Sequence, residues 1–575
     1  GNYIGGVVGF VNVGTVQRTY ATGAVSGLNS GGVSGFISVS GTVQNSYWDK
    51  GTTDQGSVIA IDNGGTTSGL TGYGSTSDAT PAPEIQGSSA SSNMGNLDFT
   101  STWETVENDD AGTTGDGYPI LQSIDRQAQL EAQDVHAYAG GDGSTDNPYE
   151  IANWYHLNNT RENLDAEFIL TADLDSNTAG YDDVASSSAN GGNGFDPIGN
   201  DSSRFTGTFN GTRHTISNLS IDRGGTFDVG LFGYVNGGTI ENVGVENVEI
   251  NGSEYVGGLA GLNYGNVTKS YATGDVNGTK YVGGLIGENF DDVNESYATG
   301  NVNATRNVGG LVGENEGNVT ESYATGDVNG TKYVGGLIGE NLEDVSESYA
   351  TGNVNATRNV GGLVGENEGN VTESYATGDV KGDEDYGGGL AGLNYGNVTK
   401  SYATGDVDGD IVGGLVGFND VEAGSNGYVA EAYATGNVSG STEVGGLVGF
   451  NPGGTVEDAY WDVDTTGQSS SAGSPDANGL TTAEMQRFAP QVTMDGFSFE
   501  SPETWLVTGG YLALAWESVT ELTVDSVEAT SPTVAEDESG TITVTANESG
   551  TDTGEGVTIE VVNNDSLDGF ATSDT

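Results

Sequence analysis

The feature that most constrains the fold of this chain is a stretch of about 26 residues that recurs along it. Residues 281–332 and 333–380 have nearly the same amino-acid sequence. Within each lies a shorter unit of the form V-G-G-L-V-G-x-N-x-G-N-V-T-x-S-Y-A-T-G-x-V. A fixed period in this range is typical of solenoids, in which a repeat buries its apolar face only by stacking on its neighbours. The sequence therefore predicts a repeat architecture whose function depends on length and surface rather than on a pocket.

The regular array runs over residues 229–461, and one leucine of the V-G-G-L phrase marks each turn. The last interval between these leucines is longer, which predicts an inserted surface loop near residues 424–426. The marking residues are Leu259, Leu285, Leu311, Leu337, Leu363, Leu390, Leu415 and Leu447.

Within one turn, residues 266–276 alternate as a β-strand does. The even-numbered residues 270–276 are small or apolar, so we expect them to face a narrow interior, and their odd-numbered neighbours to face outward. The pair Gly257 and Gly258 fits either a corner or a close backbone approach. We expect stacked turns to lie about 4.8 Å apart, the spacing of hydrogen-bonded strands.

Positions that recur in every turn become ladders in a stacked array. The repeats predict a tyrosine ladder and an asparagine ladder, and stacked amides can hydrogen-bond from turn to turn. Both ladders are interpreted as structural, and the alternative for the tyrosines is a platform on which sugar rings stack. The members are Tyr271, Tyr297, Tyr323, Tyr349, Tyr375 and Tyr402, and Asn263, Asn289, Asn315, Asn341, Asn367 and Asn394.

The charge of the chain is extreme, with 82 acidic against 15 basic residues and a formal net charge of −67. This charge excludes nucleic-acid binding, which needs a basic face. Self-repulsion destabilises a compact acidic fold at low salt, whereas a Debye length of about 3 Å in molar salt nearly removes the penalty. The composition predicts a protein of concentrated brine; the alternative is an ordinary acidic secreted protein that uses divalent cations.

The chain has no cysteine, which excludes disulfides and thiolate metal sites. Its longest apolar run, near residues 511–516, is far shorter than the roughly 20 residues of a membrane span. Since the sequence starts with Gly1 inside repeat text, we expect an excerpt of a longer protein, and the lack of a targeting segment excludes nothing.

A Tyr-Trp-Asp phrase at residues 47–49 is repeated at 460–462, each time before a Ser/Gly-rich stretch and a Thr-Trp pair. This order predicts that residues 1–125 are the C-terminal part of a first β-helix module, 126–139 a linker, and 140–516 a second, complete module. Residues 517–575 alternate with a period of two, as sandwich strands do. They are too few for a sandwich of about 100 residues, so we expect an incomplete Ig-like β-sandwich.

The G-G-L-V-G-x-N-x-G phrase followed by S-Y-A-T-G-x-V resembles the repeats of the GLUG-motif family, found in large secreted and surface-attached microbial proteins, including adhesin-like ones. Residues 194–199, 205–211 and 214–219 resemble the usual lead-in to such arrays. The resemblance covers roughly residues 1–50 and 140–516. It implies an all-β fold of right-handed parallel β-helix (solenoid) modules in tandem, and it carries over no catalytic residues. The tail is similar to bacterial Ig-like adhesin domains, and the acidity to proteins of halophilic archaea.

No catalytic constellation is apparent. The three histidines are not paired at metal-ligand spacing, and neither a G-x-S-x-G elbow nor a P-loop occurs. We therefore predict no enzyme activity and no required cofactor. Clustered hard oxygens make Ca²⁺ the better candidate, and a solvated acidic surface is the alternative. The candidate ligands are Asp142, Asp146, Asp173 and Asp175.

The Asn-x-Ser/Thr motif recurs in register. In a secreted protein these asparagines are acceptors for N-linked glycans, and the alternative is that Asn and Thr serve only as turn formers. The candidates are Asn210, Asn218, Asn251, Asn266, Asn277, Asn294, Asn303, Asn318, Asn329, Asn355, Asn370, Asn397 and Asn437.

Together these features predict a non-enzymatic, extracellular rod that acts as a cell-surface adhesin or as a filament subunit. The expected partners are further copies of the chain, other cell surfaces or glycans, with no nucleic acid and no membrane span in this segment. An incomplete sandwich would take its missing strand from the next subunit. The alternative is a carbohydrate-binding or carbohydrate-cleaving β-helix, such as a viral tail spike or fibre, which a groove with converging carboxylates and aromatic rings would favour.

Overall fold

The computed structural model describes residues 3–22, 24–27, 29–76, 86–106, 117–121, 138–421, 427–471, 477–487, 489–499, 504–508, 510–518, 526–529 and 542–545. Contacts divide the chain into two compact units, Gly1–Gly479 and Leu480–Thr575, and the boundary falls inside the predicted module 140–516. Only the last two residues of the predicted linker 126–139 are described, and the loop predicted at 424–426 lies outside the described residues.

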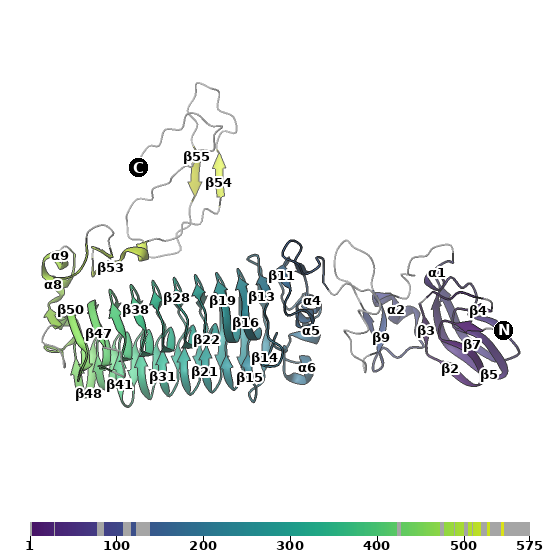
Figure 1. Ribbon diagram of the computed structural model, residues 1–575, viewed down its shortest axis with the longest axis horizontal. Helices are drawn as coiled ribbons and strands as arrows, with labels where there is room; N and C mark the ends of the chain where they lie inside the picture. Colours follow the sequence, from purple (N-terminus) through teal and green to yellow (C-terminus); the bar gives the residue numbers. More distant parts are fainter. Residues whose placement is uncertain are drawn as a thin grey trace, which may run out of the picture. The chain divides into compact units, whose positions relative to one another are not determined.

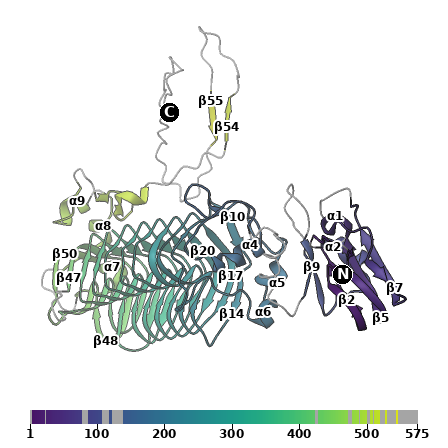
Figure 2. The same cartoon turned by 45° about the vertical axis from the view of Figure 1, so that its right-hand side comes forward.

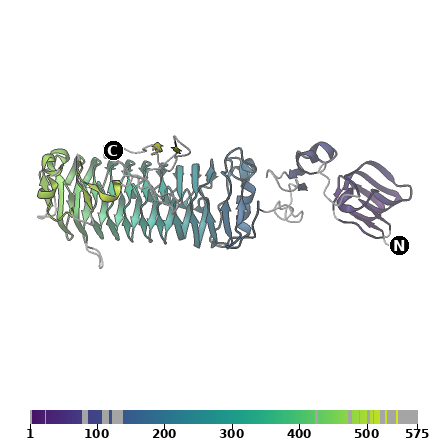
Figure 3. The ribbon, with the colours of Figure 1, turned by 90° about the horizontal axis from the view of Figure 1, so that it is seen from above.

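The array is one 42-stranded sheet, β10 to β51, wound into a coil (Figures 1 and 2). Strands of successive turns pair in parallel, so that Val282 pairs with Val308 and Val308 with Val334. The rows of aligned strands are visible from above in Figure 3. The parallel β-solenoid predicted from the period is therefore confirmed. A regular turn holds five strands: β21 Lys280–Gly283, β22 Ile286–Asn289, β23 Val293–Asn294, β24 Tyr297–Ala298 and β25 Val302–Asn303.

The next turns repeat this order as far as β44, and from β45 on neighbouring strands merge into longer ones. Their strands are β26 Arg306–Gly309, β27 Val312–Asn315, β28 Val319–Thr320, β29 Tyr323–Ala324, β30 Val328–Asn329, β31 Lys332–Gly335, β32 Ile338–Asn341, β33 Val345–Ser346, β34 Tyr349–Ala350, β35 Val354–Ala356, β36 Arg358–Gly361, β37 Val364–Asn367, β38 Asn370–Thr372, β39 Tyr375–Ala376, β40 Val380–Gly382, β41 Tyr386–Gly388, β42 Ala391–Asn394, β43 Asn397–Thr399, β44 Tyr402–Ala403, β45 Val407–Gly413, β46 Val416–Asn419, β47 Tyr428–Ala434, β48 Val438–Gly445, β49 Val448–Phe450, β50 Thr455–Asp462 and β51 Ala477–Leu480.

The interior of each turn is narrow and filled by aliphatic side chains, such as the fully buried Val282, Leu285 and Ile286. The predicted amide ladder runs through it: Nδ2 of Asn289 donates to Oδ1 of Asn315 at 2.9 Å, and the same bond continues from Asn315 to the next turn. Because buried polar groups are costly without partners, this ladder is what permits a polar residue inside every turn.

The Gly-Gly pair of each repeat serves close approach at a bend between two strands. Gly284 follows β21 and precedes β22, and a Cβ atom on it would overlap the carbonyl oxygen of Gly310 in the next turn. Gly284 does not have a positive φ. The left-handed region is instead occupied by Tyr281 within β21, at φ 55°, and by Glu295 between β23 and β24, at φ 48°, with equivalents in the following turns. Since such a φ is unfavourable for side chains other than glycine, stacking must stabilise these positions.

An aromatic cap, residues 138–235, precedes the regular turns (Figure 1). Its core holds the buried rings of Trp154, Phe168, Phe205 and Phe232, and the last two have centroids 4.9 Å apart. Its elements are β10 Tyr149–Ile151, α4 Trp154–Asn159, η2 Thr160–Glu162, β11 Glu167–Leu170, α5 Tyr181–Val184, α6 Ala189–Gly192, β12 Thr208–Asn210, β13 Thr215–Ser217, β14 Ser220–Asp222, β15 Phe227–Val229 and β16 Phe232–Glu241. Four strands then lead into the regular turns: β17 Gly244–Asn251, β18 Glu254–Val256, β19 Ala260–Thr268 and β20 Tyr271–Asn277.

Residues 3–76 form a smaller parallel sheet with the same period, in which Val8 pairs with Ser34 and Ser34 with Ile59. These residues are therefore also a solenoid. The elements of residues 3–121 are β1 Ile4–Gly5, β2 Val8–Gln17, β3 Tyr20–Ala21, β4 Ser30–Gly31, β5 Ser34–Asp49, α1 Lys50–Thr53, β6 Ile59–Asp62, β7 Thr66–Tyr73, α2 Gly87–Asn93, β8 Trp103–Val106 and β9 Gly117–Leu121.

The Tyr-Trp-Asp phrase ends both solenoids in the same way. The indole of Trp48 donates to the carbonyl oxygen of Gln55 at 2.8 Å, and that of Trp461 to Gln468 at 2.9 Å. The aspartate after each tryptophan caps a four-residue helix, α1 in the first case and α7 Val463–Thr466 in the second. The repetition seen in the sequence is therefore a repeated end structure.

The second unit contains α8 Thr482–Met485, α9 Pro490–Thr493, the antiparallel pair β52 Trp505–Leu506 and β53 Ala513–Leu514, η3 Ala515–Ser518, and the antiparallel pair β54 Ser526–Ala529 and β55 Ile542–Thr545. The predicted sandwich at 517–575 lies mostly outside the described residues, apart from the start of this range and β54 and β55.

Candidate functional site

The tyrosine ladder is a continuous stack along the array. From Tyr271 to Tyr433, successive ring centroids lie 4.6 to 5.0 Å apart with interplanar angles of 2° to 6°. Each inner ring is therefore covered on both faces by its neighbours. Because a sugar stacks on an open aromatic face, this geometry contradicts the sugar-platform alternative and supports the structural interpretation of the ladder.

A second ladder, which the sequence analysis missed, consists of glutamates. Glu288, Glu314, Glu340 and Glu366 pair in register on four successive turns. Glu288 and Glu366 are only 8% and 7% exposed. The amide Nδ2 of Asn307 donates to Oε2 of Glu314 and also to Oε2 of Glu340, at 2.5 and 2.6 Å. Four carboxylates thus lie in one row at strand spacing.

Burial, followed by the charges of Glu340 and Glu288, raises the pKa of Glu314 to about 8. Burial is also the main reason that the pKa values of Glu288 and Glu366 rise to about 7. Adjacent carboxyl groups cannot all ionise without mutual repulsion. The raised pKa values of Glu288, Glu314 and Glu366 therefore favour proton uptake by these three carboxylates near neutral pH.

Carboxylate oxygens of Glu288, Glu314 and Glu316 lie within 4.8 Å of one another, the only such group of three among the described residues. The calcium candidates predicted from the sequence are elsewhere, in the turns of the cap. Asp173 accepts hydrogen bonds from His214 and from the backbone N–H of Thr215, and the latter is the main reason that the pKa of Asp173 is lowered.

The other calcium candidates also lie in turns. Asp142 accepts from the backbone N–H of Ser144, Asp175 accepts from that of Asn177, and Asp146 is exposed. No three-carboxylate group among the described residues includes any of the four aspartates. A calcium site at these positions stays a prediction.

The glycosylation candidates fall into two rows with different spacing. Asn277, Asn303, Asn329 and Asn355 lie on adjacent turns, and their amides are chained at 3.2 to 3.3 Å. In the other row an aspartate separates the members, since Asn318 donates to Asp292 at 2.8 Å and Asn370 to Asp344 at 2.6 Å. Asn266 begins this second row, one turn before Asp292. Asn397 follows Asn370 directly, without an intervening aspartate, and donates to it.

The remaining glycosylation candidates have individual environments. Asn210 donates to Glu241 and Asn251 to Asp222. Asn218 has a φ of 65°, Asn294 carries a buried Oδ1 with no partner, and Asn437 is exposed. Whether any of them carries a glycan stays a prediction.

A cavity of about 350 Å³ lies in the aromatic cap. Its polar lining comes from η2, from the loop after α6, and from the segment between β14 and β15. It is lined by Arg161, Leu164, Asp196, Pro197, Gly199, Asn200, Ser203, Arg223, Thr226, Phe227 and Asp228. No sequence signal points to this site, because the lining residues are spread over many positions and follow no motif.

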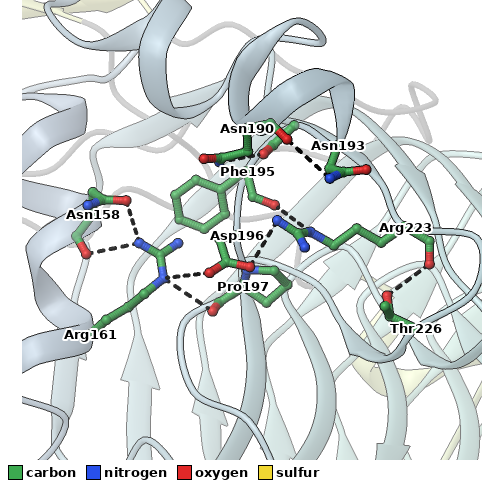
Figure 4. Close-up of polar contacts among 10 residues, drawn as sticks. Asn158, Arg161, Asn190, Asn193, Phe195, Asp196, Pro197, Arg223 and Thr226 are labelled. Carbon is green, nitrogen blue, oxygen red and sulfur yellow. Dashed lines mark hydrogen bonds and ion pairs between the residues drawn. The ribbon is translucent and has the colours of Figure 1, made fainter. Parts of the chain in front are cut away.

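Two arginines hold one aspartate in this cavity (Figure 4). Nη2 of Arg223 lies 2.9 Å from Oδ1 of Asp196, and Nε of Arg161 lies 3.9 Å from Oδ2. Nη1 of Arg161 also donates to Asn158, and the guanidinium lies 4.7 Å from the ring centre of Phe195. Burial lowers the pKa of Arg161 to about 10, which leaves it charged at neutral pH.

Four stretches of the chain match the family model described as the GLUG motif: residues 252–277, 304–329, 330–355 and 356–381. The fold and these repeats make the chain a GLUG-repeat β-solenoid. It is 30% identical to halomucin of Haloquadratum walsbyi over 665 aligned residues, which cover 95% of this chain and 6% of halomucin. The composition and this relative fit an origin in a halophilic archaeon.

A shorter match, 37% identical over 138 residues, covers 23% of this chain and 15% of a "Putative Gly-rich membrane protein" of Evansella cellulosilytica. The chain thus spans only a small part of either relative. A solved structure, named as a "putative immunoglobulin A1 protease" from Bacteroides ovatus, is 22% identical with a TM-score of 0.28, and the match covers 66% of this chain and 96% of that one. Such a distant likeness carries no argument about activity. Among the described residues, no helix has the length and apolarity to cross a membrane.

Proposed function

We propose that this chain is a non-enzymatic structural segment of an extracellular cell-surface protein, where it acts as a stiff adhesin stalk or as a filament subunit. The observation that carries the proposal is the in-register pairing of each regular turn with both of its neighbours, from β21 to β44. A stack of this kind grows in length at constant cross-section, and each turn adds only nearest-neighbour contacts. Reach and stiffness are therefore its main physical properties.

The charge and the surface support this role. The net charge of −67 favours solubility, and concentrated salt screens the self-repulsion that would otherwise destabilise the fold. The described sides of the regular turns repeat the same residue types, and a cavity of mixed lining lies apart from them in the cap. A uniform side surface suits association with further copies of the chain, with other cell surfaces or with glycans. The similarity to halomucin, which covers nearly the whole chain, fits a surface location.

Labelling of intact cells tests this proposal. Antibodies raised against the purified chain should bind unpermeabilised cells, and electron microscopy should place the label on extended surface structures. Label that appears only after permeabilisation would contradict the surface location. Release of reducing ends from a panel of polysaccharides by the purified chain would contradict the non-enzymatic role.

The alternative function is that of a carbohydrate-binding or carbohydrate-cleaving β-helix. The tyrosine ladder along the array cannot serve it as a sugar-binding surface, because the faces of the tyrosine rings are covered by their neighbours. In the cap cavity, by contrast, Asp196 and Asp228 lie with the exposed ring of Phe227. This cavity is therefore the candidate place for any recognition of sugars.

A further inference from the structure

The cap cavity combines rigid polar groups with an open aromatic face. Phe227 is 58% exposed, and it lines the cavity together with Asp196 and Asp228. Exposed large aromatic rings are unusual on this surface, where most rings are buried or stacked on one another. A cavity of about 350 Å³ lies at the lower end of the range for small-ligand sites.

The polar groups of the cavity are fixed before any ligand arrives. Arg223 donates Nε to the carbonyl oxygen of Phe195 at 3.2 Å and places Nη2 on Asp196. Asp196 itself is held between Arg223 and Arg161, yet 56% of its side chain remains exposed. Because these side chains are already held in place, ligand binding would cost little free energy for ordering them.

Two kinds of hydrogen-bonding atom remain open. Nη1 of Arg223 has no hydrogen-bond partner among the described residues and is not buried, so it can donate to a ligand. The carboxylate oxygens of Asp196 and Asp228 can accept. Arg161 adds no accessible donor, since its Nε and Nη1 are engaged and its Nη2, which has no hydrogen-bond partner, is buried.

From this arrangement we propose that the cap cavity binds one neutral pyranose unit of a glycan. The ring of Phe227 covers the apolar face of the sugar, while Asp196 and Asp228 accept from its hydroxyl groups and Arg223 donates to a ring or hydroxyl oxygen. Sugar binding at this site would be a function additional to the proposed role of the solenoid as a rod. The rod proposal does not depend on this site.

The charges of the cavity favour a neutral sugar over an acidic one. The positive charges of Arg161 and Arg223 are balanced by the negative charges of Asp196 and Asp228. Next to Asp228, the charges of Asp201 and Arg204 balance each other. The cavity therefore has no excess positive charge to pair with the carboxylate or sulfate of an acidic sugar. An anion would also meet the field of a chain with a net charge of −67.

Saturation-transfer NMR on the full chain in molar NaCl tests the proposal. The probes are the methyl glycosides of glucose, galactose and mannose, together with glucuronate as the charged analogue. At least one neutral glycoside should receive saturation transfer, and its affinity should fall roughly tenfold in Phe227→Ala, the loss expected for one stacked ring. Phe450→Ala is the matched control, because Phe450 is also exposed, at 39%, but lies at the far end of the array. This control should bind like the unaltered chain.

Three results would overturn the proposal: no transfer to any neutral glycoside, equal binding by Phe227→Ala, or tighter binding of glucuronate than of every neutral probe. Asp196→Asn adds a second test, since loss of a charged acceptor should weaken binding while the circular dichroism spectrum stays unchanged. The rod proposal survives all of these failures, because it is tested by surface labelling and not by sugar binding.

Discussion

Glu314 and Glu340 occupy the same position on adjacent turns and accept hydrogen bonds from a single amide nitrogen, Nδ2 of Asn307. The pKa of Glu314 is about 8 in the folded chain, against an ordinary value of 4.5. The folded state therefore binds more protons than the unfolded state between these values, and stability falls as the pH rises.

Replacing Glu314 by Gln should remove this dependence. Below pH 4.5 the variant and the parent should be equally stable with respect to this group, whereas above pH 8 the variant should be more stable by at least about 1 kcal/mol, the equivalent of one pKa unit. Chemical denaturation at a series of pH values measures the difference. Glu249→Gln, at an exposed position, is the control. An equal effect of both substitutions at pH 9 would contradict the burial argument.

Salt should stabilise the fold. The melting temperature should rise by several degrees or more between 0.1 and 3 M NaCl, because the Debye length falls from about 10 Å to less than about 3 Å and screens the self-repulsion of −67 charges. Circular dichroism melts would show the shift, and sucrose of equal osmolality separates screening from general exclusion effects. An unchanged melting temperature would contradict the interpretation as a brine protein.

Breaking the buried amide ladder should be costly. In Asn341→Ala, the Nδ2 of Asn315 loses one of its two acceptors and keeps the carbonyl oxygen of Gly317, while the Oδ1 of Asn367 loses its donor Asn341. This should destabilise the array by about 1–3 kcal/mol. Asn329→Ala interrupts an exposed amide chain and should change stability by less than about 0.5 kcal/mol. Urea unfolding of both variants gives the comparison. Equal effects would mean that the interior ladder contributes nothing specific.

The close approach of turns predicts a sharp contrast between two glycines. A Cβ atom on Gly336 would overlap the carbonyl oxygen of Gly362 and lie 2.9 Å from the Cβ of Ala350. Gly336→Ala should therefore destabilise the array by roughly 2 kcal/mol or more, as overpacking does. Gly225→Ala meets nothing within 4 Å and should be tolerated. Thermal melts check this, and a tolerated alanine at residue 336 would refute the close packing.

The spacing of the asparagine rows predicts a pattern of modification. Neighbouring turns lie about 4.8 Å apart, which is too close for two glycans, whereas alternate turns are about 10 Å apart. If the native protein is glycosylated, Asn266, Asn318 and Asn370 can all be occupied in one molecule. Adjacent asparagines of the row from Asn277 to Asn355 should not be. Mass spectrometry of glycopeptides spanning Asn303 and Asn329 checks this, and double occupancy would contradict it.

The repeat period was enough to predict the solenoid, its register and the amide ladder, because equivalent positions of neighbouring repeats align when the turns stack. It did not predict the left-handed residues, since nothing in the local sequence marks Tyr281 or Glu295 as such. The glutamate row was missed because the repeated Gly-Glu-Asn phrase looks like a turn, whereas Glu288 lies in a strand. The cap cavity brings together residues up to 67 positions apart, from Arg161 to Asp228, which no local pattern reveals.

Because the turns are nearly identical in sequence, the chain can misfold by pairing the wrong turns with one another. During folding, a strand of one repeat can pair equally well with strands of several other repeats, so the repeats alone do not determine which turns become neighbours. The aromatic cap does determine where the stack begins, because the buried rings of Trp154, Phe168 and Phe205 occur only once in the chain and define which turn packs first. Assembly that starts there and proceeds turn by turn avoids slipped, shortened products, and loss of the cap should leave a mixture of misaligned stacks.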